Sequence, residues 1–197
     1  MTFFLTVVIF MAVSFLAVAL KYQTKSYFRL PVAVRTAASL LHALVVLTNI
    51  CLYGLLCAFD YASLDLPLAL RAAGTLLALP GIYLILAGVA ALKAKLFFPV
   101  QTDRLATGGF YGLVRHPMYL GGIAGSLGIA LAAASRFALY YTGVLAVVLY
   151  AVSRLEERDL AQRFGPGFEE YRRRVPALMP TPGSLARFIA GRRGERM

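Results

Sequence analysis

Five long apolar runs constrain this chain more than any other feature of its sequence. They lie at roughly 1–20, 36–59, 67–92, 118–134 and 137–153. An α-helix needs about twenty such residues to cross the hydrocarbon core of a bilayer. Hydrophobic residues make up 60% of the 197 and charged residues 15%, whereas soluble domains average about 45–50% and about 25%. We therefore expect an all-α integral membrane protein with about five transmembrane helices.

The last two apolar runs are short, and only Ser135 and Arg136 separate them. This connection predicts a tight helical hairpin, which need not cross the bilayer fully. No internal repeat and no low-complexity linker divides the chain. We expect a single membrane domain over 1–197, with a cytoplasmic amphipathic C-terminal helix.

Basic residues fall almost entirely on one predicted side of the membrane. Asp60 and Asp65 occupy the second loop with no Lys or Arg between them, and 18 of the 20 basic residues lie in the first loop, the third loop or the C-terminal part, the exceptions being Arg71 and Arg136. Lys and Arg mark the cytoplasmic side. We expect an N-terminus outside and a cytoplasmic C-terminus, in a bacterial inner membrane. The net charge of +11 then reflects topology and anionic inner-leaflet lipids, and no nucleic acid partner is predicted.

Cysteine and histidine content argues against two other kinds of site. Cys51 and Cys57 lie in one apolar run, where they are typical of small hydrophobic residues and not of a disulfide scaffold. The two histidines lie in different apolar or flanking segments, and no cysteine pair has ligand spacing. No metal site is predicted.

The first polar stretch enters the fourth apolar run. Pro117 suits the first turn of a helix, so Arg115 and His116 are expected at its mouth, beside unsatisfied backbone donors that favour an anion. Several glycines follow and leave one side of the helix open to another helix or to a ligand: Gly121, Gly122, Gly125 and Gly128. Close helix packing is the interpretation that these glycines favour on their own.

The second polar stretch begins where the fifth run ends. Its apolar residues recur at helical spacing and predict an amphipathic helix on the inner membrane surface: Leu155, Leu160, Phe164 and Phe168. Glu156 and Glu157 differ from the exposed charges because they sit at the end of a transmembrane helix. Adjacent residues point about 100° apart on a helix, so we expect one of the two acids to face a binding pocket.

Taken together, the two stretches resemble the C-terminal signature of integral membrane methyltransferases, the isoprenylcysteine carboxyl methyltransferase and phospholipid N-methyltransferase superfamily. The resemblance rests on Arg115-His116-Pro117-Met118-Tyr119-Leu120-Gly121, a helical hairpin, Glu156-Glu157, Phe164-Gly165, Tyr171, Val175-Pro176 and Pro180. The Arg-His-Pro-x-Tyr pattern with a later Glu-Glu is more specific than either part alone. The resemblance implies a methyltransferase region with a cofactor site over 105–180, after N-terminal spans in 1–100 and before a basic tail over 181–197.

S-Adenosylmethionine is the cofactor that this resemblance implies. Arg115 and His116, at the helix mouth, suit its carboxylate, while Glu156 or Glu157 suits its ribose hydroxyls or its ammonium. The resemblance favours Glu157 for this cofactor role.

Further cofactor contacts are expected from aromatic residues and glycines. Tyr119 and Tyr171 suit the flat adenine or the closure of the pocket. Gly88 corresponds loosely to a glycine motif of the phospholipid branch, and Gly121 is the last residue of the Arg115–Gly121 motif quoted above. Both glycines are therefore included in the predicted cofactor site.

The expected acceptor is a membrane lipid that enters from the bilayer, most simply the head-group amine of phosphatidylethanolamine or its methylated derivatives. Such an amine must lose a proton, which His116, Glu157 or Asp159 can accept, and we assign His116 and Glu157 as catalytic. Arg173 and Arg174 suit an anionic head group. Three alternatives stay open: an isoprenylcysteine carboxyl O-methyltransferase, a non-enzymatic membrane scaffold, and an NADPH-dependent reductase, since some membrane sterol reductases share this C-terminal resemblance.

Overall fold

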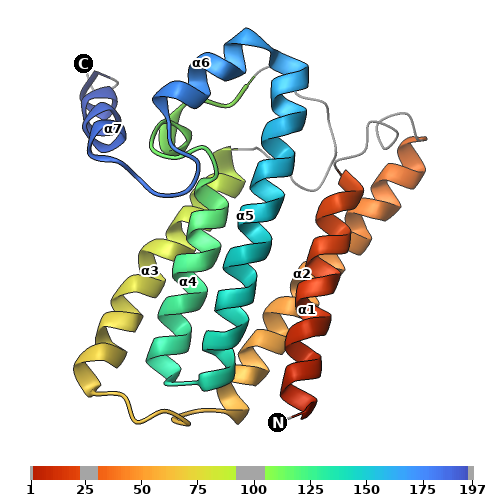
Figure 1. The fold of residues 1–197 in the computed structure, drawn as a ribbon, viewed down its shortest axis with the longest axis vertical. Coiled ribbons are helices and arrows are strands. Elements are labelled where there is room, and N and C mark those ends of the chain that lie inside the picture. Colours follow the sequence, from red (N-terminus) through yellow and green to blue (C-terminus); the bar gives the residue numbers. More distant parts are fainter. Residues whose placement is uncertain (1, 23–30, 92–104, 195–197) are drawn as a thin grey trace.

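The computed structural model describes residues 2–22, 31–91 and 105–194, which contain helices and no strand. In chain order the elements are α1 (Thr2–Tyr22), α2 (Val32–Phe59), α3 (Leu68–Ala91), the short 3-10 helix η2 (Gly109–Gly112), α4 (Pro117–Ala133), α5 (Arg136–Phe164), α6 (Pro166–Arg174) and α7 (Pro182–Gly194). Helices α3, α4 and α5 lie side by side, α1 and α2 lie beside α5, and η2, α6 and α7 gather at one end (Figure 1).

Five of these helices correspond to the five predicted apolar runs. Within the part of the chain that the structure describes, α2, α3 and α5 are long and apolar enough to cross a membrane, whereas α4 has 17 residues. The all-helical class is confirmed, and the long apolar helices are those of a membrane protein. The count of five spans and the orientation stay predictions, because the basic loops lie partly in 23–30 and 92–104, outside the described residues.

Helices α3 and α4 contact each other through glycines. A Cβ atom added at Gly121 would lie 2.7 Å from the carbonyl oxygen of Gly81, and one at Gly128 would lie 2.6 Å from that of Gly74. Both distances are shorter than real Cβ contacts. The close packing predicted for the glycines of α4 is therefore confirmed, and α4 is held against α3 at backbone distance.

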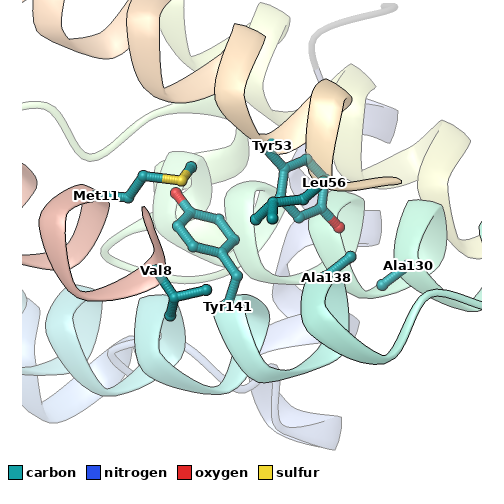
Figure 2. Close-up of a cluster of buried hydrophobic side chains, with 7 residues drawn as sticks. All are labelled: Val8, Met11, Tyr53, Leu56, Ala130, Ala138 and Tyr141. Atoms are coloured by element: carbon teal, nitrogen blue, oxygen red, sulfur yellow. The ribbon is translucent and has the colours of Figure 1, made fainter. Parts of the chain in front are cut away.

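A buried apolar cluster joins the N-terminal helices to the α4–α5 hairpin (Figure 2). Its members come from α1, α2, α4 and α5: Val8, Met11, Tyr53, Leu56, Ala130, Ala138 and Tyr141. The rings of Tyr53 and Tyr141 lie 5.1 Å apart, and the Tyr53 hydroxyl donates to the Ser126 carbonyl oxygen at 2.5 Å. Satisfying this hydroxyl inside an apolar cluster fixes α2 on α4.

The α4–α5 turn is closed by a side chain from the α2–α3 loop. Asp60 Oδ2 accepts hydrogen bonds from Ser135 Oγ at 3.0 Å and from the backbone N–H of Phe137 at 2.9 Å. Ala134 reverses the chain in a left-handed conformation, with φ of +51°. The predicted tight hairpin is present, and Asp60 satisfies a free N–H at the start of α5.

Helix α5 is longer than the sequence indicated. The fifth run was expected to end at residue 153, but the helix continues to Phe164 and stops at Gly165, where φ is +52°. Leu155 and Leu160 therefore lie on α5, and the amphipathic helix is the shorter α6, whose Phe168 is buried against this end of α5. Hydropathy falls at residue 154 but no helix breaker occurs before the glycine, which explains the difference. A membrane-surface position for α6 stays a prediction.

Helix α7 occupies most of the segment expected to be a basic tail. The N–H of Thr181 donates to Ser184 Oγ at 3.0 Å, and the N–H of Ser184 donates to Thr181 Oγ1 at 3.2 Å. Reciprocal side-chain capping of this kind, with Pro182 in the first turn, starts a helix. The residues 181–184, Thr-Pro-Gly-Ser, carry this signal in the sequence.

Candidate active site at the mouth of helix α4

Arg115 and His116 are placed by backbone contacts on both sides. His116 is the N-cap residue of α4, and Pro117 occupies the first turn as expected. The N–H of Arg115 donates to the Pro176 carbonyl at 2.8 Å, and that of His116 to the Ala177 carbonyl at 3.0 Å. The segment that follows α6 is thereby held against the mouth of α4, which brings two distant parts of the chain into one site.

The guanidinium of Arg115 is bound by the protein itself. Its Nε and Nη2 both donate to Glu157 Oε1, at 2.9 and 2.7 Å. Its Nη1 donates to the carbonyl of Arg172 at 3.0 Å and to that of Val175. The side chains of Arg115 and Glu157 are 8% and 3% exposed. A buried ion pair is stable only when its remaining polar atoms are satisfied, and here four of the five N–H groups of Arg115 are used.

The imidazole of His116 lies between two carboxylates. Its Nε2 is 3.2 Å from Glu157 Oε1, and its Nδ1 is 3.4 Å from Glu156 Oε2. A neutral imidazole has one N–H and one bare nitrogen, and the bare nitrogen would face a carboxylate lone pair. Burial lowers the pKa of His116, but the hydrogen bonds and negative charges of Glu156 and Glu157 outweigh burial, so its pKa lies above the ordinary value. The geometry favours the imidazolium.

Glu156 is the accessible acid of the pair. Its side chain is 40% exposed, and the Tyr119 hydroxyl donates to its Oε1 at 2.6 Å. The Tyr119 ring stacks on the imidazole of His116, with ring centroids 5.4 Å apart and ring planes inclined by 3°. A carboxylate fixed by two neighbours yet open on one side can accept hydrogen bonds from a ligand.

The remaining residues of the predicted cofactor site are one tyrosine and two glycines. Tyr171 lies close to the cluster, and its hydroxyl donates to the carbonyl of Tyr111 at 2.7 Å. Gly121 lies in the α3–α4 contact, and Gly88 faces the side chain of Met118. Both glycines therefore lie where α3 and α4 pack, and their part in the cofactor site stays a prediction.

Charged residues of α6 lie on its exposed side. Arg173 is exposed, and Arg174 forms an ion pair with Glu170. A residue that the sequence interpretation missed is Arg154, whose Nη1 lies 3.3 Å from Glu157 Oε2 and whose side chain is 53% exposed. Its position three residues before Glu157 on one helix was the available signal. Among the residues that the structure describes, no group of three potential ligands forms a metal site.

The part of the chain that contains this site matches a known protein family. Residues 69–167, half of the chain, match the family described as Phospholipid methyltransferase. This segment contains α4, α5, nearly all of α3, and the Arg115, His116, Glu156 and Glu157 cluster.

Three relatives share shorter segments with the chain. Methanethiol S-methyltransferase 2 of Bradyrhizobium diazoefficiens is 40% identical over 72 residues, 36% of this chain and 26% of the relative. Cobalt-zinc-cadmium resistance protein CzcN of Cupriavidus metallidurans is 43% identical over 84 residues, which are 41% of this chain and 37% of the relative. Delta(14)-sterol reductase TM7SF2 of Mus musculus is 36% identical over 81 residues, which are 40% of this chain and 19% of the relative. The matched part thus covers less than two fifths of each relative. No solved structure matches the chain.

Proposed function

Because this chain belongs to the phospholipid methyltransferase family, we propose that it transfers a methyl group from S-adenosylmethionine to a membrane-embedded lipid amine, that of phosphatidylethanolamine or its methylated derivatives. The observation that carries the proposal is the Glu156 carboxylate, which is open on one side and held by His116 and Tyr119 within the family segment. Region 105–180 of one membrane domain then contains the site, with the cofactor arriving from the cytoplasm and the lipid from the bilayer.

The chemistry of the cluster fits the cofactor's polar groups. Glu156 is a carboxylate with exposed oxygen, which suits an ammonium or a ribose hydroxyl. Arg115 has nearly all its donors occupied by Glu157 and by backbone carbonyls. The half-exposed Arg154 is therefore the guanidinium of the cluster better suited to the cofactor's carboxylate. The sequence left Glu156 and Glu157 open for this cofactor role with a preference for Glu157, and the proposal gives the role to Glu156.

Arg115, His116 and Glu157 act in this proposal as positioning residues. Glu157 binds Arg115 and His116 at one oxygen, and His116 in turn holds Glu156. The orientation of Glu156 is thus fixed before any ligand binds, which lowers the entropic cost of aligning the reactants. The cofactor, when bound, supplies an electrophilic methyl group on a positively charged sulfur.

The lipid amine must lose a proton before it can accept the methyl group. His116 as an imidazolium has no lone pair for this proton, and Glu157 has its oxygens turned toward Arg115, His116 and Arg154. Glu156 is the acid with an accessible oxygen, so we assign the proton to a Glu156 carboxylate oxygen. This assignment revises the expectation that His116 and Glu157 are the catalytic pair.

A thiol acceptor is the second candidate, because methanethiol S-methyltransferases are among the relatives. A carboxylate acceptor of the isoprenylcysteine type would need no base. A nicotinamide-dependent reductase is a further alternative, because the chain is similar to a sterol reductase. The chemistry of a thiol also requires loss of a proton, so Glu156 would serve both the amine and the thiol.

Calorimetric titration with S-adenosylhomocysteine on protein in detergent tests the cofactor first. We expect saturable binding with about one site per chain, and a scaffold or a nicotinamide-dependent enzyme would give none. Incubation with labelled S-adenosylmethionine and, in separate arms, phosphatidylethanolamine, a small thiol and a farnesylcysteine analogue then identifies the acceptor. Label in none of the three products would contradict the proposed reaction.

A further inference from the structure

A pocket of about 480 Å³ lies between η2, α6 and α7, beside the cluster at the mouth of α4. Its lining contains three charged side chains, Glu170, Arg174 and Arg187. Tyr171 and Val175 form part of its wall, and the carbonyl of Val175 accepts a hydrogen bond from Arg115 of the candidate active site. The pocket and the active site therefore share a wall.

The charges in the pocket leave one uncompensated cation. Glu170 and Arg174 form an ion pair, whereas Arg187 donates to the backbone carbonyl of Arg174, a neutral acceptor. A guanidinium has five N–H donors, and this contact uses one of them. The lining thus carries a net charge of one positive unit and donors that suit the oxygens of a phosphate.

Glycines leave room for a ligand in this pocket. A Cβ atom added at Gly108, Gly109 or Gly167 would meet no heavy atom within 4 Å, and all three residues line the pocket. Open space beside backbone atoms and a cation is the arrangement that an anionic group needs.

The surroundings favour an anion that belongs to a lipid. The segment that carries Arg187 also exposes large apolar side chains, those of Met179 (74%), Leu185 (46%) and Ile189 (48%). Leu185 and Ile189 share α7 with Arg187, and Met179 precedes this helix. Exposed apolar side chains close to a cation suit the bilayer interface, where lipid phosphates lie. The cofactor's carboxylate, by contrast, requires no apolar neighbours.

From these observations we infer that the η2–α6–α7 pocket binds the phosphate of the acceptor lipid, with Arg187 as its principal ligand. The inference rests on the proposed function and specifies its substrate as a phosphate-bearing lipid. Glu170, Arg174, Arg187 and the other residues from 170 onward lie beyond the family segment 69–167.

Two variants alter the pocket in different ways. Arg187→Gln removes the cation, and Gly108→Leu fills open space at a residue with φ of −87°, which any amino acid adopts. Arg163→Gln is the matched control, because Arg163 pairs with Asp159 on α5 and does not line the pocket. The probe is sn-glycero-3-phosphoethanolamine, titrated into each folded protein in detergent, with inorganic phosphate and S-adenosylhomocysteine as separate arms.

We expect Arg187→Gln to weaken binding of the probe about tenfold, because one charge-assisted hydrogen bond is lost. Gly108→Leu should also weaken probe binding, because its side chain occupies the open space that the probe needs. Both should raise KM for phosphatidylethanolamine in mixed micelles and leave the affinity for S-adenosylhomocysteine unchanged, while Arg163→Gln matches the wild type. A probe that does not bind the wild type, or binds both pocket variants equally well, overturns the inference. A loss of S-adenosylhomocysteine affinity in the pocket variants also overturns the inference, because it would assign the pocket to the cofactor. Binding of inorganic phosphate by the wild type, with an unchanged KM for phosphatidylethanolamine in the pocket variants, overturns it as well. Failure of the wild type to bind S-adenosylhomocysteine would refute the proposed function, while the probe titration would still decide the pocket.

Discussion

The two ends of the helix bundle both carry polar networks, and the networks differ in their partners. At the α4–α5 turn, Asp60 accepts from the Ser135 hydroxyl and from a backbone N–H, and Arg71 Nε donates to the Ala132 carbonyl at 3.1 Å. At the opposite end (Figure 1), Arg115, His116, Glu156 and Glu157 bind one another as charged groups.

The difference in partners distinguishes a network that stabilises the fold from one that is suited to binding a ligand. Charged side chains that satisfy backbone groups cap helices and close turns, and their charge has no further task. Mutually paired charges cost desolvation energy that packing alone does not require. A network of the second kind with one accessible carboxylate is expected where a ligand binds. The following substitutions test that contrast.

Arg115→Ala should have the largest effect, on stability. It leaves the buried Glu157 carboxylate without its main cation, and removal of one partner from a buried ion pair costs about 3–5 kcal/mol. Denaturant unfolding in detergent measures the free energy. The double variant Arg115→Ala with Glu157→Gln should recover part of the loss, because the uncompensated charge is gone. A stability equal to that of the wild type would contradict the pairing.

Glu156→Gln should reduce affinity for S-adenosylhomocysteine by about ten- to a hundredfold, or about 1.5–3 kcal/mol, because a charge-assisted hydrogen bond is lost. The free energy of unfolding should change little, since this side chain is 40% exposed. Glu169→Gln on the exposed side of α6 is the control for removal of one negative charge, and its cofactor affinity should equal that of the wild type. Equal affinities for all three proteins would remove Glu156 from the site.

Asp60→Ala should lower the free energy of unfolding by about 1–2 kcal/mol, as for the loss of a helix cap. The affinity of the folded protein for S-adenosylhomocysteine should not change, because the substitution lies at the far end of the bundle. Asp65→Ala in the same loop is the matched control, since Asp65 is exposed. A drop in cofactor affinity at constant stability would erase the distinction between the two ends.

His116 should give the smallest effect, a pH dependence of stability. Because its pKa is raised in the folded protein, the imidazolium stabilises the fold fully below its unfolded pKa of about 6.5, and this contribution is lost as pH rises through the folded pKa. Unfolding of the wild type and of His116→Gln should be compared from pH 6 upward. The wild type should lose stability relative to the variant as pH rises, and parallel curves would contradict a bound imidazolium.

The sequence located the helices well because hydropathy reports on burial in lipid. The five apolar runs predicted helices α1 to α5, and Pro117 indicated where α4 starts. The end of α5 was missed because the residues after 153 are polar and yet form helix, so that only the backbone at Gly165 stops it. Helix α7 was missed because its start depends on two side chains, Thr181 and Ser184, and not on hydropathy.

For the site, the sequence identified which residues gather but not how they pair. Arg115 and Glu157 are 42 positions apart, and their contact depends on how α4 and α5 lie in space. Helical periodicity shows that Glu156 and Glu157 face different directions, but not which of them faces inward. Partner choice among several nearby charges is decided by tertiary geometry, which a single sequence does not contain.

The glycine contact between α3 and α4 bears on how sequence variants of this protein should be interpreted. Gly128 lies twelve residues from His116, about 18 Å along the axis of α4, yet a side chain there would push against the Gly74 carbonyl. The resulting tilt of α4 would displace its mouth. A mutational scan would therefore show as large a loss of activity at this remote glycine as at a residue of the candidate active site.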